Sequence, residues 1–148
     1  MPSYETLDAI ADSYNPALLA LSVACLVHSL FRARWQLSLA RFHALAVIAF
    51  FVYGLMFLDR RLDIWDSAGL DYSTHTALAL SLVLFLYFCA RRWAPLWIGS
   101  LVCYVILMLY QRYHSLADVL TTAIAVGVPV GAILFWTFSY APAQPEKS

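Results

Sequence analysis

Charged residues are scarce in this sequence of 148 residues. They make up 12% of the chain, and nine Lys and Arg balance nine Asp and Glu. With no net charge and no basic tail, nothing indicates binding to nucleic acid, and we expect no such partner. Hydrophobic residues, in contrast, account for 63% of the chain, well above the share in soluble domains. This composition predicts an integral membrane protein.

Metal-binding and leader-peptide patterns are also missing. Each cysteine lies inside an apolar run without the paired spacing of a metal site, which favours a packing role: Cys25, Cys89 and Cys103. No Lys or Arg precedes the first apolar run, whereas Glu5, Asp8 and Asp12 do, and this is the wrong charge for a cleavable signal peptide. We therefore expect the first apolar run to remain in the mature protein.

Long apolar runs dominate the chain. Five can be drawn, separated by short polar connections: 17–31, 42–58, 72–90, 93–110 and 116–138. A transmembrane helix needs about 20 apolar residues, so the sequence predicts an all-α integral membrane bundle of about five transmembrane helices. We expect residues 1–148 to form one domain, with an interfacial segment at 1–14 and a flexible tail at 141–148.

Arginines are unevenly distributed between the connections. Those after the first and third runs contain five arginines and no acidic residue: Arg32, Arg34, Arg41, Arg91 and Arg92. After the second run, four aspartates outweigh Arg60 and Arg61. Because basic loops favour the cytoplasmic side, we expect the N-terminus outside the cell membrane and the C-terminus in the cytoplasm. The starts of the third and fifth runs then lie on the non-cytoplasmic face.

Two polar clusters begin the third and fifth runs. In YHSLADVLTT, residues 113–122, His114 and Asp118 are four residues apart, so on a helix both side chains share one face. The carboxylate could then orient the imidazole as a nucleophile or base, and an ionisable pair at membrane depth favours a functional role. The alternative interpretation is a helix cap at the membrane interface that happens to include a histidine.

The second cluster, YSTHTA at residues 72–77, places Ser73 and Thr74 before His75. Hydroxyls at a helix start cap unpaired N–H groups, and these groups, with the positive end of the helix dipole, suit a phosphate. Simple capping is the alternative. Three arginines expected on the same face could hold phosphate oxygens, or could be ordinary snorkelling residues of the interface: Arg60, Arg61 and Arg112.

Both clusters match the motifs of a known family. Residues 73–76, Ser-Thr-His-Thr, and 113–119, Tyr-His-Ser-Leu-Ala-Asp-Val, resemble the second and third motifs of the type 2 phosphatidic acid phosphatase superfamily. Those motifs are Pro-Ser-Gly-His and Ser-Arg, five residues, His, three residues, Asp. The sphingomyelin synthase branch, with Ser-Gly-His-Thr and His-Tyr-Thr-x-Asp-Val, is closer still. The resemblance covers residues 71–122, about a third of the chain.

The chain departs from the superfamily pattern at several positions. Tyr72 stands in place of Pro, and Thr74 in place of Gly. The Ser-Arg pair of the third motif falls on Leu107 and Met108, so its phosphate-binding arginine is missing, as it is in the synthase branch. The first motif, Lys, six residues, Arg-Pro, is not present, and one of the three arginines named above could replace it.

The resemblance implies phosphoryl transfer without a metal or cofactor. His114 would attack the phosphorus of a lipid phosphate or phospholipid, Asp118 would orient and stabilise His114, and His75 would protonate the leaving alkoxide. The phosphohistidine would then pass its phosphoryl group to water in a phosphatase or to an alcohol in a phosphotransferase. Ser73, Thr74 and the arginines would bind the substrate phosphate.

Three other functions stay open. Histidines near both faces could hold two haems in a membrane electron carrier: His28, His43, His75 and His114. A zinc site could form from His75, His114 and Asp118, and the missing first motif would also suit a non-enzymatic helical scaffold. Separately, Gly127 and Gly131 form a small-xxx-small pair that predicts a close helix contact, within the bundle or between copies in a homo-oligomer.

Overall fold

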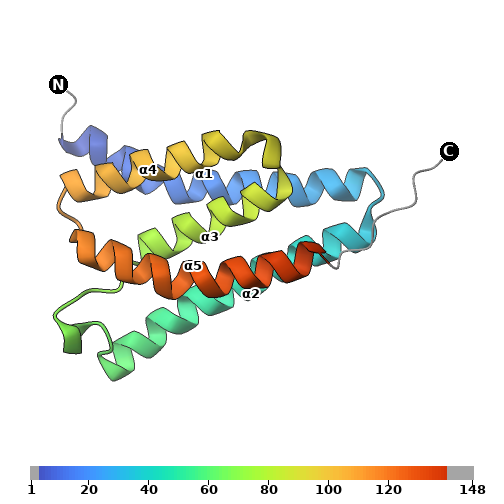
Figure 1. Ribbon diagram of the computed structural model, residues 1–148. Coiled ribbons are helices and arrows are strands. Elements are labelled where there is room, and N and C mark those ends of the chain that lie inside the picture. Colours follow the sequence, from blue (N-terminus) through green and yellow to red (C-terminus); the bar gives the residue numbers. More distant parts are fainter. Residues whose placement is uncertain (1–3, 140–148) are drawn as a thin grey trace.

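The computed structural model describes residues 4–139, and over that range the chain forms helices without any strand. Five α-helices run up and down the bundle (Figure 1): α1 Tyr4–Phe31, α2 Trp35–Leu62, α3 Thr74–Cys89, α4 Ala94–Tyr110 and α5 Leu116–Ser139. Two short 3-10 helices lie in the connections, η1 (Asp66–Ala68) before α3 and η2 (Arg91–Trp93) after it.

The lengths and surfaces of the helices suit a membrane. Four segments are long and apolar enough to cross one: Tyr4–Phe31, Trp35–Leu62, Arg91–Tyr110 and Leu116–Ser139. Their outer surfaces carry exposed apolar side chains such as Phe50, Ile106 and Val128, a pattern that soluble proteins avoid over large areas. The predicted all-α membrane bundle is confirmed, with four spanning candidates and the shorter apolar helix α3.

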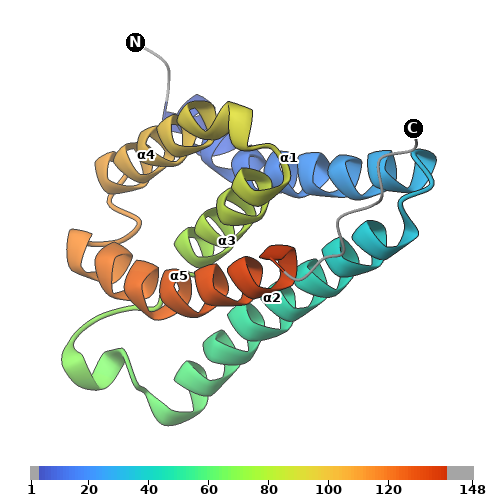
Figure 2. The same ribbon diagram turned by 45° about the vertical axis from the view of Figure 1, so that its right-hand side comes forward.

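Helix α3 lies at the centre of the bundle. It contacts each of the other four α-helices, and in both views it runs between α1 and α4 on one side and α2 and α5 on the other (Figures 1 and 2). A helix that is apolar all round is buried, and Ala79, Leu82 and Phe85 are among its buried side chains. Because α3 packs against all four other α-helices, the position of its first turn is fixed, and so is the position of the residues just before it.

Helices α1 and α2 begin earlier than the apolar runs indicate. α1 starts at Tyr4, so residues 4–14 of the predicted interfacial segment form its first turns, and α2 starts at Trp35. Each helix has 28 residues, which at 1.5 Å per residue is about 42 Å, longer than a hydrocarbon core of about 30 Å. The interfacial position of residues 4–14 stays a prediction, and the tail predicted at 141–148 lies outside the described residues.

The two ends of the bundle differ in their polar residues. At one end, here called the histidine end, α2 stops and both α3 and α5 begin, so His75 and His114 lie there. At the other, here called the arginine end, α1 is joined to α2 and α3 to α4. Four arginines of the predicted cytoplasmic side lie in these connections, and Arg41 lies near the start of α2. Which end faces the cytoplasm stays a prediction.

Candidate active site

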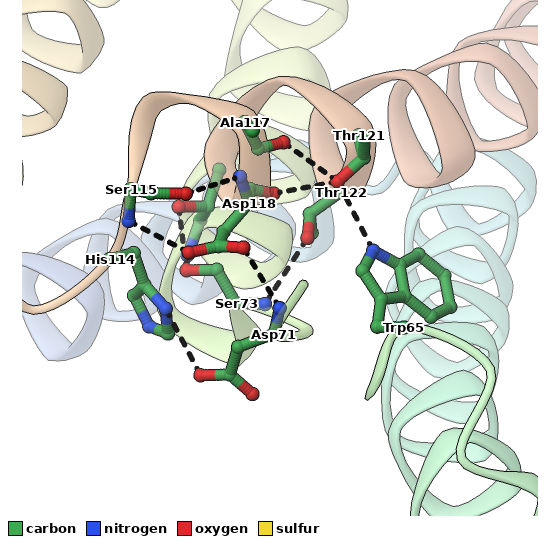
Figure 3. Close-up of polar contacts among 10 residues, drawn as sticks. Trp65, Asp71, Ser73, His114, Ser115, Ala117, Asp118, Thr121 and Thr122 are labelled. Carbon is green, nitrogen blue, oxygen red and sulfur yellow. Dashed lines mark hydrogen bonds and ion pairs between the residues drawn. The ribbon is translucent and has the colours of Figure 1, made fainter. Parts of the chain in front are cut away.

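The connection between α2 and α3 folds onto the first turns of α5. Its tight turn includes Gly69 at φ +69°, a conformation that glycine adopts without strain. Three hydrogen bonds hold the connection in place (Figure 3): Trp65 Nε1 donates to Thr121 Oγ1 at 3.2 Å, the Asp71 N–H to Asp118 Oδ1 at 2.8 Å, and the Ser73 N–H to Thr122 Oγ1 at 3.1 Å. The residues just before α3 are therefore fixed against the start of α5.

Ser115 and Asp118 cap the start of α5 reciprocally. The Asp118 N–H donates to Ser115 Oγ at 3.2 Å, and Asp118 Oδ2 accepts the Ser115 N–H at 2.7 Å, the arrangement of a capping box. This agrees with the interpretation of the segment as a helix cap. Because the cap starts α5 at Leu116, His114 lies before the helix and not in its first turn.

His114 is paired with Asp71. Its Nδ1 lies 3.2 Å from Asp71 Oδ2, an ion-pair distance without the alignment of a hydrogen bond. Within residues 4–139 no hydrogen bond joins His114 to Asp118, contrary to expectation, because both Asp118 oxygens accept backbone N–H groups. Asp118 affects His114 indirectly. It accepts the backbone N–H of Asp71, and the Asp71 carboxylate faces His114 (Figure 3).

Ser73 caps α3 and is fully buried. Its Oγ accepts the Thr76 N–H at 3.3 Å and donates to Thr76 Oγ1 at 2.8 Å, while its own N–H is bonded to Thr122. These bonds agree with the capping alternative. Ser73 therefore stabilises the start of α3 from within the bundle. The neighbouring Thr74 lines the cavity at the histidine end.

His75 and His114 line one cavity of about 400 Å³ at the histidine end. The rest of its wall comes from the end of α2, the α2–α3 connection and the start of α3: Met56, Asp59, Arg60, Asp71, Tyr72 and Thr74. His75 is exposed, whereas the side chain of His114 is only 12% exposed. Two imidazoles, one of them beside a carboxylate, can supply a nucleophile and an acid or base to a ligand in this cavity.

Charges of both signs line the cavity, and each carboxylate has a partner. Asp59 Oδ1 accepts the Trp65 N–H at 2.8 Å, and Asp71 faces His114. Arg60 is the cation without an acidic partner among the cavity residues. A bound phosphate would meet this guanidinium together with the imidazoles, which are the groups that can balance its charge.

Arg60 alone of the three predicted phosphate-binding arginines lines this cavity. The Arg61 guanidinium lies over the Phe57 ring, 5.1 Å from its centroid. Arg112 is exposed in the α4–α5 turn, where its φ is +58°. The structure therefore brings together His75, His114, Thr74 and Arg60, and leaves Arg61 and Arg112 outside the cavity wall.

Tyr72 forms a buried part of the cavity wall. Its hydroxyl donates to the Val52 carbonyl at 3.1 Å, and its ring packs edge-on against Trp65 with centroids 5.0 Å apart. Burial, with a smaller contribution from the Asp59 carboxylate, raises the pKa of Tyr72 to about 12. The phenol therefore stays protonated at neutral pH and anchors the chain where it enters α3.

An apolar groove of about 420 Å³ adjoins the cavity, and His75 lines both. The groove walls come from α1, α2 and α3: Leu19, Leu45, Ile48, Tyr53, Leu78 and Leu82 are among them. Asn15 of α1 donates from Nδ2 to the His75 carbonyl at 3.2 Å, which ties the groove to the first turn of α3. A polar cavity and an apolar groove that meet at one histidine fit an amphiphilic ligand.

The glycine pair of α5 makes one close contact inside the bundle. A β-carbon on Gly127 would lie 3.0 Å from Leu80 Cδ2 of α3, whereas one on Gly131 would meet nothing within 4 Å. The predicted close helix contact is therefore made at Gly127, between α5 and α3. A contact between copies in a homo-oligomer stays a prediction.

The positions of the histidines do not favour the zinc site or the haem site considered as alternatives. Within residues 4–139, no group of three or more His, Cys, Asp or Glu side chains is placed to hold a metal ion. His28 lines cavities at the arginine end, and His43 is not among the residues that line them. The pair of histidines predicted to hold a haem at that end therefore does not share a cavity.

Asp71 was not singled out from the sequence as a site residue. Its position just before the second motif, four residues from His75, was a usable signal. Its partner could not be read from the sequence, since the approach to His114 depends on the hydrogen bond between the Asp71 N–H and Asp118.

Comparison of the chain with family models, with curated proteins and with solved structures found no match. The likeness to the phosphatase superfamily therefore rests on the two motifs, and any function rests on the chemistry of the cavity.

Proposed function

We propose that the protein is a membrane lipid phosphate phosphatase or phosphotransferase that works through a phosphohistidine at the histidine end. The proposal rests on one observation: His75 and His114, which belong to motifs far apart in the sequence, line one cavity, and His114 Nδ1 lies 3.2 Å from Asp71 Oδ2. From the distribution of arginines we assign this cavity to the non-cytoplasmic face.

In the proposed reaction, Nε2 of His114 attacks the phosphorus of a lipid phosphate. The Asp71 carboxylate beside Nδ1 stabilises the positive charge that the imidazole gains as the N–P bond forms. The P–O bond to the lipid breaks, and His75 donates a proton to the leaving alkoxide. Arg60 balances part of the charge on the phosphoryl oxygens.

The second half-reaction regenerates the protein. His75, now neutral, accepts a proton from water or from an acceptor alcohol as its oxygen attacks the phosphohistidine. The N–P bond breaks and His114 is restored. With water the product is inorganic phosphate, and with an alcohol it is a new phosphate ester.

The groove supports a substrate with a hydrocarbon tail. It shares His75 with the cavity, so a phosphate held by His75 and Arg60 would leave its tail beside Leu78 and Leu82 of α3. A water-soluble phosphate ester would leave this apolar surface uncovered. Phosphatidic acid and isoprenyl diphosphates are therefore suitable first substrates.

The test measures phosphate release by the purified protein from a panel of lipid phosphates in the presence of a strong chelator. We expect release in the wild type, and a loss of about a hundredfold or more in His114→Ala and in His75→Ala, the range expected for a removed nucleophile or general acid. His43→Ala is the matched control, because His43 lies on α2 outside the cavity, bonded to the Leu39 carbonyl, and it should keep full activity.

An acid-labile phosphoprotein that is absent from His114→Ala would identify the nucleophile. Equal activity in wild type and His114→Ala would overturn the mechanism. Complete inactivity of the wild type on the panel would favour the scaffold alternative, and a Soret band in the purified protein would favour the haem carrier.

A further inference from the structure

The arginine end contains a cavity of about 660 Å³ and a smaller one of about 260 Å³ next to it. The two share His28, Arg34 and Arg41, so we describe them together as the arginine cavity. Five arginines and one histidine line it, with no Asp or Glu: Arg32, Arg34, Arg41, Arg91, Arg92 and His28. It lies at the opposite end of the bundle from the proposed active site.

Within residues 4–139, no carboxylate balances the charges of the arginine cavity, because none of its arginines forms an ion pair with one. Aromatic rings hold two of them in position: the Arg91 guanidinium lies 5.5 Å from the Phe88 centroid, and that of Arg92 lies 5.6 Å from the Trp93 centroid. Like charges gathered around one space repel each other, and a bound anion would relieve that repulsion.

The guanidinium of Arg41 has one hydrogen-bonded and one unsatisfied donor at the cavity wall. Its Nη1 donates to the Cys25 carbonyl at 2.6 Å, which fixes the guanidinium at the cavity wall. Its Nε is buried and has no hydrogen-bond partner. An unsatisfied donor on a charged group is costly, and an oxygen of a bound anion would satisfy it.

A preference of arginine for the cytoplasmic side accounts for the number of arginines at this end. It does not account for their convergence on one cavity, because arginines that only mark topology extend toward water. Planar guanidinium groups bind phosphate through paired hydrogen bonds, and basic pockets between membrane helices accept lipid head groups.

We propose that the arginine cavity binds the phosphate group of an anionic ligand. A phospholipid head group fits best, because the same cavity has apolar walls at Leu21, Leu86 and Trp97 against which an acyl chain can lie. The site is independent of the proposed catalysis, since it shares no residue with the cavity at the histidine end.

Binding is tested with the full chain in detergent. Phosphatidylglycerol, phosphatidylcholine and inorganic pyrophosphate are titrated separately, and bound lipid or anion is counted by native mass spectrometry. We expect phosphatidylglycerol to bind about tenfold or more tightly than phosphatidylcholine, and Arg41→Gln to remove most of that preference. If pyrophosphate binds and this binding is lost in Arg41→Gln, the ligand of the arginine cavity is a soluble phosphate compound.

Two further variants complete the experiment. The double variant Arg34→Gln/Arg91→Gln changes exposed side chains, so it should fold even if Arg41→Gln does not, and it should weaken phosphatidylglycerol binding as well. Arg61→Gln is the matched control, because it removes one exposed arginine at the other end and should bind like the wild type. Cysteine alkylation gives a second measurement: phosphatidylglycerol should protect Cys25, which lines the cavity, and leave Cys103 unchanged.

Equal binding of phosphatidylglycerol and phosphatidylcholine, with no pyrophosphate binding, would overturn the proposal. An equal loss of preference in Arg61→Gln and Arg41→Gln would also overturn it, because the attraction would then come from net charge and not from the cavity. Neither result bears on phosphate release at the histidine end.

Discussion

At the scale of the residue, two aspartates of the candidate site have separate roles. Asp71 presents a largely exposed carboxylate, 72% accessible, to His114. Asp118 is buried, and its two oxygens accept the N–H groups of Asp71 and Ser115. Removal of the first carboxylate should therefore affect the chemistry, and removal of the second should affect the fold.

We expect Asp71→Asn to lower phosphate release by about tenfold to a hundredfold, because the amide cannot stabilise a positively charged imidazole as a carboxylate does. The melting temperature should change little, since the side chain is exposed. Asp66→Asn, which changes an exposed aspartate of η1, is the control for activity. Unchanged release from Asp71→Asn would show that His114 needs no carboxylate partner.

Asp118→Ala should instead destabilise the protein by about 2–6 kcal/mol, since two partly buried N–H donors lose their acceptor at about 1–3 kcal/mol each. Thermal unfolding in detergent measures this change. A fully stable Asp118→Ala protein with no activity would mean that Asp118 acts directly in the reaction, as the superfamily resemblance implies.

Tyr72 gives a prediction at alkaline pH. Its pKa in the folded protein is about 12, above the ordinary value of 10.0, so the buried phenol opposes ionisation. The stability associated with the neutral phenol is fully present below about pH 10 and is lost as the pH rises toward 12. Unfolding midpoints of the wild type should therefore fall more steeply over this interval than those of Tyr72→Phe, and parallel slopes would contradict the assignment.

At the scale of the element, two contacts of α5 determine the geometry of the histidine end. The first turns of α5 bind the α2–α3 connection through Asp118, Thr121 and Thr122, and farther along Gly127 lies against Leu80 of α3. The cavity at the histidine end depends on both contacts, because they set the position of His114 relative to His75.

The two glycines of α5 provide a matched pair of substitutions. Gly127→Ile should destabilise the protein by about 1–3 kcal/mol through overpacking against Leu80. The β-carbon of Gly131→Ile would meet nothing within 4 Å, so this change should be nearly neutral. Thermal unfolding in detergent compares them. A Gly131→Ile protein that is destabilised, or whose size by light scattering changes, would instead indicate a contact between copies.

The existence of the five helices could be predicted from the apolar runs, and most ends of these runs lie close to the ends of the observed helices. The run 93–110 corresponds to α4 and 116–138 to α5. The starts of α1 and α2 were placed too late, because an apolar run excludes polar turns such as those around Asp8 and Gln36 although these remain helical. The start of α5 was readable from Ser115 and Asp118, which have the spacing of a capping box.

At the scale of the whole molecule, the arginine distribution predicts the orientation in the membrane. In a variant without the three native cysteines, Ser67→Cys in η1 should react with an impermeant thiol reagent on intact cells. Gln36→Cys, exposed near the start of α2, should react only after the membrane is opened. The reverse pattern would move the proposed active site to the cytoplasmic face and the arginine cavity to the outside.

Composition and local spacing determined the membrane class, the number of helices and the identity of both histidines, because hydropathy and helix capping depend on neighbouring residues alone. The pairing of Asp71 with His114, the choice of Arg60 from three arginines and the gathering of five arginines around one cavity were decided by the tertiary structure. Each joins segments that are distant in the chain. The packing of α3 against its four neighbours, together with the hydrogen bonds between the α2–α3 connection and α5, sets how those segments meet.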